Sequence, residues 1–171
     1  MNVVKYNGDI YPELQTKGNS AQFAMPFAKS MLRGQGLDIG CNRPEWSFPE
    51  AKLVDITIDD PYHAFHLPEG KYDYIFSSHC LEHLSDWVGA LDLWTQHLKK
   101  GGGQYDENGG IMFLYLPHYA QQYWRPWNNR KHLSVLQPEM LRDYYESRGF
   151  RNIIVTEGYD LNHSFYAVAE L

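Results

Sequence analysis

The sequence predicts an α/β domain in which helices flank a mainly parallel β-sheet. Short apolar, β-favouring runs alternate with segments of helical periodicity, which is the order that parallel strands with crossover connections require. The last two apolar runs, residues 153–156 and 165–169, are joined by a turn, and we expect an antiparallel strand to close the sheet. A ligand would then bind beyond the carboxyl ends of the parallel strands.

The N-terminal part of the chain, residues 1–35, is expected to be a helical segment. Phe23, Phe27 and Met31 recur at four-residue spacing, which places them on one helical face. Pro26 should divide or kink this segment, because proline removes a backbone hydrogen bond.

Four strands are expected to follow, each recognised by β-favouring or apolar residues between turn signals. They cover residues 36–40, 52–56, 72–77 and 110–116. The first runs into a tight glycine turn, and the last is apolar throughout, as a strand buried on both faces would be.

Two helices are expected in the second half of the chain. Ser85 or Asp86 can cap the first, which ends at the Lys-Lys-Gly of residues 99–101, since basic residues and then glycine suit a helix C-terminus. The second covers residues 137–147 and is stopped by Gly149.

Composition bounds the classes of function. The 171 residues carry 15 Lys and Arg against 21 Asp and Glu, and 43% are hydrophobic, which suits a single domain over residues 1–171 with its own core. The net charge of −6 disfavours bulk nucleic-acid binding. The sequence shows neither a membrane span nor a signal peptide, and Cys41 and Cys80 suit reduced thiols, so we expect a cytoplasmic protein.

A first candidate site lies where the strands at residues 36–40 and 52–56 end. Gly40 allows the backbone to approach a ligand closely, and Asp38 is a carboxylate that can hold an ammonium group. Asp55 ends the next strand, where a carboxylate can accept hydrogen bonds from both hydroxyls of a ribose. Residues 42–44, Asn-Arg-Pro, replace the further glycines of a dinucleotide-binding loop, which argues against an NAD site.

Several segments in order resemble the motifs of class I S-adenosylmethionine-dependent methyltransferases, in particular the branch that modifies small molecules and glycans. The segments are LDIGCN (37–42), HLPEGKYDYIFSSHCLEHLSDW (66–87), LKKGG (98–102), GGIMFLYLPH (109–118) and RKHLSVLQPEMLRDYYESRGF (130–150). The match spans residues 36–169. It implies a Rossmann-like fold and S-adenosylmethionine as the cofactor.

The resemblance also implies which residues bind the cofactor. The loop after the first strand would contact the methionine part, the second loop the ribose and adenine, and the third loop the surroundings of the sulfonium. These residues are Gly40, Cys41 and Asn42 on the first loop, with Asp38 on the preceding strand near the ammonium group, Asp55 and Ile56 on the second loop, and Ser78 and His79 on the third.

The sequence departs from the family on the adenine side. Residues 41–51 and 57–71 are too few for the usual helices and strand, so we expect a sheet trimmed at that edge. Asn42 replaces a usual glycine, although asparagine tolerates positive φ. The family's Asp-Ala pair, which reads the adenine amine, has only His63-Ala64 or Asp59-Asp60 as stand-ins.

Methyl transfer from a sulfonium is an in-line displacement, so catalysis needs an oriented acceptor and a base for its proton. The candidate bases are His118 and His132, although each histidine could instead fix a loop through hydrogen bonds. The aromatic and basic segment 119–130 could stack on a sugar or planar acceptor, pack on the core as a lid, or form a homodimer face.

The predicted function is methyl transfer to a small molecule or glycan, at oxygen. One alternative is a methyltransferase-like binding module that has lost catalysis. Another is a zinc hydrolase, because His79, Glu82 and His83 fit the H-x-x-E-H pattern. We favour a bracing role for Glu82 and His83 at the helix entry, and no metal ligands are expected.

Overall fold

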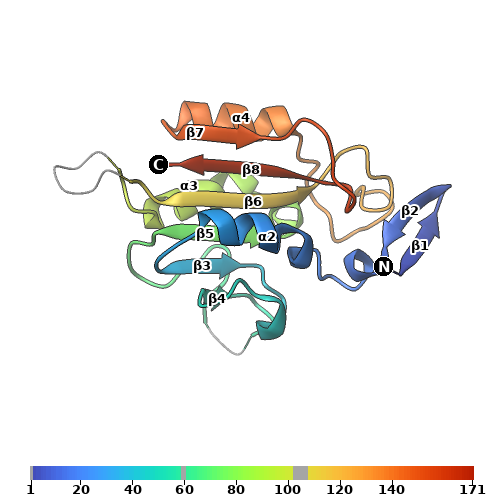
Figure 1. The fold of residues 1–171 in the computed structure, drawn as a ribbon, viewed down its shortest axis with the longest axis horizontal. Helices are drawn as coiled ribbons and strands as arrows, with labels where there is room; N and C mark the ends of the chain where they lie inside the picture. Colours follow the sequence, from blue (N-terminus) through green and yellow to red (C-terminus); the bar gives the residue numbers. More distant parts are fainter. Residues whose placement is uncertain (1, 59–60, 102–107) are drawn as a thin grey trace.

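The computed structural model describes residues 2–58, 61–101 and 108–171, and its centre is a six-stranded sheet in the order β4-β3-β5-β6-β8-β7 (Figure 1). The strands are β3 (Gly36–Ile39), β4 (Lys52–Val54), β5 (Tyr74–Ser78), β6 (Ile111–Pro117), β7 (Arg151–Val155) and β8 (Ser164–Glu170). Strands β4, β3, β5 and β6 pair in parallel, and β8 pairs antiparallel with both β6 and β7. The predicted Rossmann-like fold with an antiparallel closing strand is confirmed.

Helices cover both faces of this sheet. Helix α2 (Ala21–Met31) lies in front of it in Figure 1, and α3 (Trp87–His97) lies behind. The core on the α2 side contains Ala24 and Ala28 with aromatic residues of the strands, among them Phe76 and Phe113. The core on the other side joins α3 to α4 (Pro138–Ser147), so the sheet is buried on both faces.

The helices begin and end close to where the sequence predicts. The Asp86 carboxylate accepts a hydrogen bond of 2.8 Å from the Gly89 amide and caps α3. Pro138 occupies the first turn of α4, where the missing amide hydrogen costs nothing. Pro26 lies inside α2, which runs through it as one helix, so the expected division is not formed.

Residues 3–12 differ from the expected helical segment. They form a hairpin of β1 (Val3–Tyr6) and β2 (Asp9–Pro12), followed by the short helix α1 (Glu13–Thr16). Asn7 and Gly8 between the strands have φ values of 48° and 89°. Asn-Gly in a two-residue turn with positive φ is a strong hairpin signal, and the helical interpretation of this part was wrong because it overlooked that pair.

The expected trimming of the sheet is present on the β4 side. Strand β4 is an edge strand, and the link from β3 contains one 3-10 turn, η1 (Pro44–Trp46), instead of a full helix. Between β4 and β5 the described residues form no helix and no further strand. The short connections therefore leave β4 as the edge of the sheet on this side.

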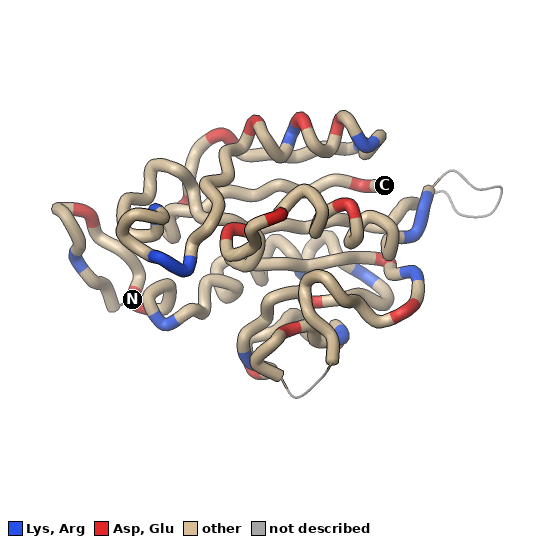
Figure 2. Tube along the Cα trace, turned by 180° about the vertical axis from the view of Figure 1, so that it is seen from behind, with Lys and Arg blue, Asp and Glu red and all other residues tan. Residues whose placement is uncertain are grey.

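Charged residues of both signs are interspersed over the surface, as Figure 2 shows along α4. Within the described part of the chain, no helix combines the length and apolarity needed to cross a bilayer.

Candidate functional site

A cavity of about 730 Å³ lies at the carboxyl ends of β3, β4 and β5. This is the edge at which a parallel sheet of this type binds its ligand. Six of the eight residues predicted to bind a cofactor line it: Gly40, Asn42, Asp55, Ile56, Ser78 and His79.

Asp55 connects two loops of the cavity. Its Oδ2 accepts a hydrogen bond of 2.7 Å from the Asn42 amide, and its Oδ1 accepts one of 2.8 Å from the Thr57 amide. The Thr57 hydroxyl also lies 2.7 Å from Oδ1, so it is Oδ2 that keeps a further lone pair with which Asp55 can accept a hydrogen bond from a ligand. Ile56 beside it is 82% exposed and offers an apolar surface for a planar ring.

The turn after β3 brings the backbone close to the third loop. Gly40 has a φ of 83°, and a Cβ at this position would lie 2.3 Å from the Cβ of Cys80. Asn42 has a φ of 61°, which confirms that asparagine adopts the left-handed conformation here. Glycine is required at position 40 for space as well as for conformation.

Asp38 and Cys41 do not line the cavity. Asp38 is buried, and its Oδ2 accepts a hydrogen bond of 2.6 Å from the Phe48 amide, which tethers the chain after η1. Burial raises the pKa of Asp38 to about 7, against the opposing effect of the Phe48 amide. Burial and the nearby Asp38 and Asp55 raise the pKa of the Cys41 thiol to about 12. Both residues therefore lie outside the cavity lining, and Asp38 supports the link between β3 and β4 through Phe48.

His79 follows directly after β5 and has a φ of 50°. Its Nε2 lies 2.8 Å from the Ser164 hydroxyl, which connects the cavity wall to β8. Burial, and then the neighbouring His132 and His83, hold the pKa of His79 well below its ordinary value. The imidazole is therefore uncharged at neutral pH.

Glu82 lies in the 3-10 turn η2 (Leu81–His83) and is 1% exposed. Its backbone carbonyl accepts hydrogen bonds from the amides of Leu133 and Ser134, at 2.8 and 3.0 Å. These bonds hold the 129–133 loop, which completes the cavity, against η2.

Three imidazoles surround the Glu82 carboxylate. Oε1 lies 3.6 Å from Nδ1 of His79, 3.9 Å from Nε2 of His83 and 4.0 Å from Nε2 of His132. Neither carboxylate oxygen has a hydrogen-bond partner among the described residues. Burial raises the pKa of Glu82 to about 7, and His83 opposes this effect. Because His79 and His132 are uncharged, their contacts with Glu82 are not ion pairs.

The arrangement required of an H-x-x-E-H zinc hydrolase is not formed. Its two histidines belong on successive turns of a helix, but η2 is a single 3-10 turn, and His79 lies outside it with positive φ. His83 donates a hydrogen bond of 2.8 Å from Nδ1 to the Lys131 carbonyl. Glu82 and His83 therefore brace the 129–133 loop, and their 3-10 turn also contacts α3, the helix whose entry they were predicted to brace.

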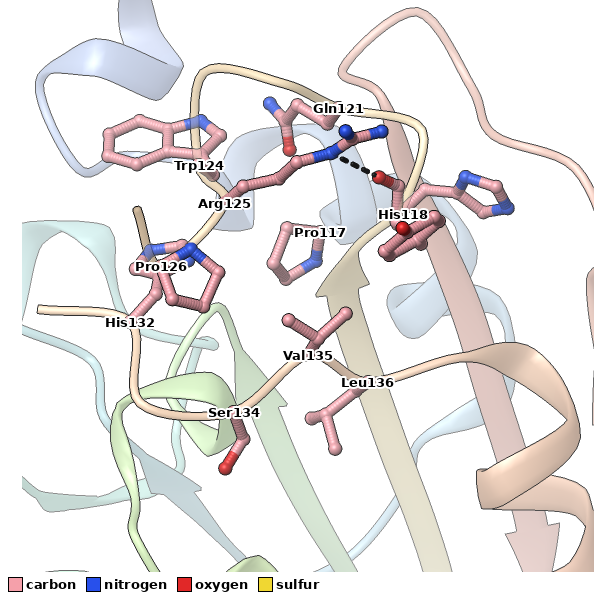
Figure 3. A pocket seen from close by; sticks show the side chains of 11 residues that line it. Pro117, His118, Gln121, Trp124, Arg125, Pro126, His132, Ser134, Val135 and Leu136 are labelled. Atoms are coloured by element: carbon pink, nitrogen blue, oxygen red, sulfur yellow. Dashed lines mark hydrogen bonds between the residues drawn. The ribbon is translucent and has the colours of Figure 1, made fainter. Parts of the chain in front are cut away.

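His118 and His132 are not brought together at the cavity. His132 lines it, is buried, and stacks on Trp124 with the ring centroids 5.3 Å apart. Burial lowers the pKa of His132 to about 4. Both ring nitrogens of His118 are engaged, Nε2 by the Glu157 carbonyl and Nδ1 by the Ala120 amide. Figure 3 shows His118 and His132 on opposite sides of Pro117 in a neighbouring small pocket.

Two parts of the cavity wall were not predicted as site residues. Gln15, Thr16, Lys17, Gly18 and Ser20 come from the N-terminal segment, and Lys131 and Leu133 flank His132. The sequence carries one signal for the first group, the polar Lys-Gly-Asn-Ser run at residues 17–20. In the structure Gly18 within this run has a φ of 84°.

The aromatic segment 119–130 packs partly on the protein itself. Tyr123 contacts Tyr6 and Tyr11 of the hairpin, with ring centroids 5.0 and 5.6 Å apart. Trp127 is 65% exposed, and the Arg125 guanidinium lies 5.4 Å from its ring centroid. The lid interpretation therefore fits Tyr123.

Of the two residue pairs that could read the adenine amine, the structure describes His63-Ala64. Ala64 lines the cavity, and its carbonyl accepts a hydrogen bond from the Trp94 indole. His63 Nδ1 accepts a hydrogen bond of 3.2 Å from the Phe65 amide. Asp59 and Asp60 lie outside the described residues.

Comparisons with known proteins agree with this geometry. The family model described as "Methyltransferase domain" matches residues 17–155. A comparison with curated protein sequences gives no match.

Solved structures of three methyltransferases have a similar fold. A SAM-dependent methyltransferase from Archaeoglobus fulgidus is 17% identical with a TM-score of 0.62, over 93% of this chain and 97% of that chain. The N-methyltransferase NodS from Bradyrhizobium japonicum, in complex with S-adenosyl-L-homocysteine, is 13% identical with a TM-score of 0.58, over 92% and 87%. A putative S-adenosylmethionine-dependent methyltransferase from Listeria monocytogenes is 13% identical with a TM-score of 0.55, over 88% and 99%.

Proposed function

Because the chain belongs to the methyltransferase-domain family, we propose that it binds S-adenosylmethionine in the 730 Å³ cavity and transfers the methyl group to an oxygen atom. The acceptor is a small molecule or a glycan. The observation that carries this proposal is Asp55, a half-exposed carboxylate that holds two cavity loops together and keeps a lone pair on Oδ2 for a ligand.

The cofactor lies along the three loops that end β3, β4 and β5. Asp55 accepts hydrogen bonds from the ribose hydroxyls, and the exposed Ile56 packs against the adenine. The close turn at Gly40 and Asn42 contacts the methionine part, while Asp38 supports that turn from behind. In this order the sulfonium would lie beside Ser78 and His79, which line the cavity.

The acceptor then lies toward His132. An acceptor hydroxyl attacks the methyl carbon, so an oxygen–carbon bond forms while the carbon–sulfur bond breaks and S-adenosylhomocysteine leaves. The hydroxyl proton passes to Nε2 of His132, which is uncharged and lines the cavity. Of the two predicted bases, His132 alone has this placement, and His118 is not assigned a catalytic role.

Calorimetric titration with S-adenosylmethionine and S-adenosylhomocysteine tests the cofactor assignment. We expect one ligand per chain, and at a hundred times its dissociation constant a ligand should stabilise the fold by about 2.7 kcal/mol in thermal unfolding. No binding of either compound at millimolar concentration would overturn the proposal. Release of S-adenosylhomocysteine in a screen of hydroxyl-bearing acceptors then identifies the acceptor.

A further inference from the structure

The cluster of Glu82, His83 and His132 has the composition of a metal site. One atom from each residue, a carboxylate oxygen and two imidazole nitrogens, lies within 4.8 Å of the other two. Two ligands of a tetrahedral metal ion, each about 2.1 Å from it, lie about 3.4 Å apart. The largest of these spacings would have to close by up to about 1.4 Å, or about 0.7 Å for each of two side chains, to bring the three residues onto one ion.

The buried Glu82 carboxylate lacks the partners that such a group normally has. It is 1% exposed, and both of its oxygens are without a hydrogen-bond partner among the described residues. Burying an unpaired carboxylate is costly, and buried charges are usually paired or coordinate a metal ion. The nearest imidazole nitrogens are all 3.6 Å or more away, so they do not satisfy it.

The two histidines already present the correct nitrogen atoms. His83 donates from Nδ1 to the Lys131 carbonyl, which leaves the lone pair on Nε2, the atom that faces Glu82. Metal-binding histidines typically make this second hydrogen bond. The His132 ring is held by stacking on Trp124 at an interplanar angle of 11°, with its Nε2 also toward Glu82.

We propose that Glu82 Oε1, His83 Nε2 and His132 Nε2 bind one divalent transition-metal ion at the acceptor end of the cavity. Two imidazoles and a carboxylate suit Zn²⁺, Co²⁺ and Fe²⁺ rather than Mg²⁺, which prefers oxygen ligands. All three residues line the cavity, so further coordination positions are open to water or to an acceptor oxygen.

The ion changes how the acceptor is activated, and this part of the inference rests on the proposed methyl transfer. A hydroxyl bound to the ion loses its proton to solvent more readily, because the positive charge lowers the hydroxyl pKa. His132 Nε2 cannot bind the ion and accept a proton at once, so in the metal-bound protein it is a ligand. The site therefore favours acceptors whose hydroxyl can coordinate a metal ion.

Titration of the chelator-treated full chain with Co²⁺ tests the site, because Co²⁺ bound by nitrogen and oxygen ligands absorbs visible light. We expect one equivalent of Co²⁺ to bind and Zn²⁺ to displace it, while millimolar Mg²⁺ does not. The absence of any absorption change at millimolar Co²⁺ would overturn the proposal.

Three variants assign the ligands. Glu82→Gln removes the carboxylate at nearly constant volume, and His83→Asn keeps a donor for the Lys131 carbonyl while removing Nε2. His132→Asn removes the third ligand. Each should weaken Zn²⁺ binding about 100-fold or more, measured by competition with a chromogenic chelator. Wild-type affinity in all three variants would reject this ligand set.

The matched control is His66→Asn. His66 is exposed, and its Nδ1 lies 3.1 Å from the Pro61 carbonyl, so asparagine can keep that contact. This variant should bind one Zn²⁺ with wild-type affinity, and loss of binding would contradict the assignment. Titration of the metal-free protein with S-adenosylhomocysteine separates the two proposals, since that ligand should bind near Asp55 whether or not the metal site exists.

Discussion

The Asp55 carboxylate accepts a hydrogen bond of 2.7 Å from the Asn42 amide and thereby joins the loops that follow two neighbouring strands. Asn42 needs positive φ for this contact, and Thr57 binds the other carboxylate oxygen from the far side. A carboxylate fixed by two backbone amides is preorganised, because its position does not depend on the ligand.

Asp55→Ala should weaken the binding of S-adenosylhomocysteine about 10- to 100-fold, since hydrogen bonds to a charged group contribute about 1.5–3 kcal/mol. Asp55→Asn keeps one oxygen for the Asn42 amide and should show a smaller loss. Calorimetry measures both affinities. Asp143→Ala, a change on the exposed side of α4, is the control and should bind as the wild type does. An unchanged dissociation constant in Asp55→Ala would remove Asp55 from the ribose role.

Gly40→Ala should destabilise the protein by about 2–5 kcal/mol, because positive φ and the overlap with Cys80 both oppose a Cβ. Urea unfolding measures the loss. Gly149→Ala is the matched control, since Gly149 has a φ of 75° but no atom within 4 Å of its added Cβ. The control should lose about 1–2 kcal/mol, the conformational cost alone.

The double variant Gly40→Ala with Cys80→Gly checks the overlap directly. Removing the Cys80 side chain takes away the atoms that the new Cβ would meet. We expect the two changes to couple, so that the double variant is more stable than the sum of the single effects. If the two effects were strictly additive, the overlap with Cys80 would not be the cause of the destabilisation by Gly40→Ala.

Asp38 should make stability depend on pH with a definite sign. Its folded pKa is raised to about 7 by burial, from an ordinary value of 3.8. Between these values the folded protein keeps a proton that the unfolded chain releases, so the unfolding free energy decreases as the pH rises. The contribution is complete below the unfolded pKa, is lost progressively up to about pH 7, and is of the order of 2–4 kcal/mol.

Asp38→Asn removes this titration while keeping an oxygen for the Phe48 amide. The difference in unfolding free energy between wild type and variant should therefore shift by about 2–4 kcal/mol from acidic to mildly alkaline pH, in favour of the variant. Urea unfolding at a series of pH values measures it. Because Glu82 and the histidines remain in both proteins, they cancel in the difference, and a constant difference would refute the prediction.

Tyr123→Leu should loosen the N-terminal hairpin. The Tyr123 ring contacts Tyr6 and Tyr11, and each aromatic pair contributes about 0.5–1.5 kcal/mol beyond its buried area. Hydrogen exchange of the amides in β1 and β2 should become faster. Trp127→Leu changes a neighbouring exposed ring and should leave this exchange unchanged. Equal protection in both variants would show that the hairpin holds without Tyr123.

The order of the strands and helices follows from local features of the sequence. Residues 111–116 are apolar without interruption, which suits only a central strand, and they form β6 between two neighbours. The links on the two sides of β4, residues 41–51 and 57–71, are too short for the family's usual helices and strand, whatever the tertiary contacts are. The hairpin at Asn7 and Gly8 also had a local signal, although the helical interpretation overlooked it.

The contacts inside the cavity depended on tertiary structure. Asp38 and Cys41 lie within two residues of Gly40 in the chain, but both are buried and do not line the cavity, which sequence proximity to Gly40 does not reveal. His118 and His132 look alike as candidate bases until the Glu157 carbonyl and the Ala120 amide are seen to engage the His118 ring.

The contact between Glu82 and His132 shows most clearly what the sequence determines and what the tertiary structure decides. The motif places Glu82 and His83 next to each other, and this much the amino-acid sequence determines by itself. His132 reaches them only because the amides of Leu133 and Ser134 bind the Glu82 carbonyl and fold their loop back onto η2. Such a contact joins segments far apart in the chain, so it is decided by how the loop satisfies its backbone hydrogen bonds and not by local pattern.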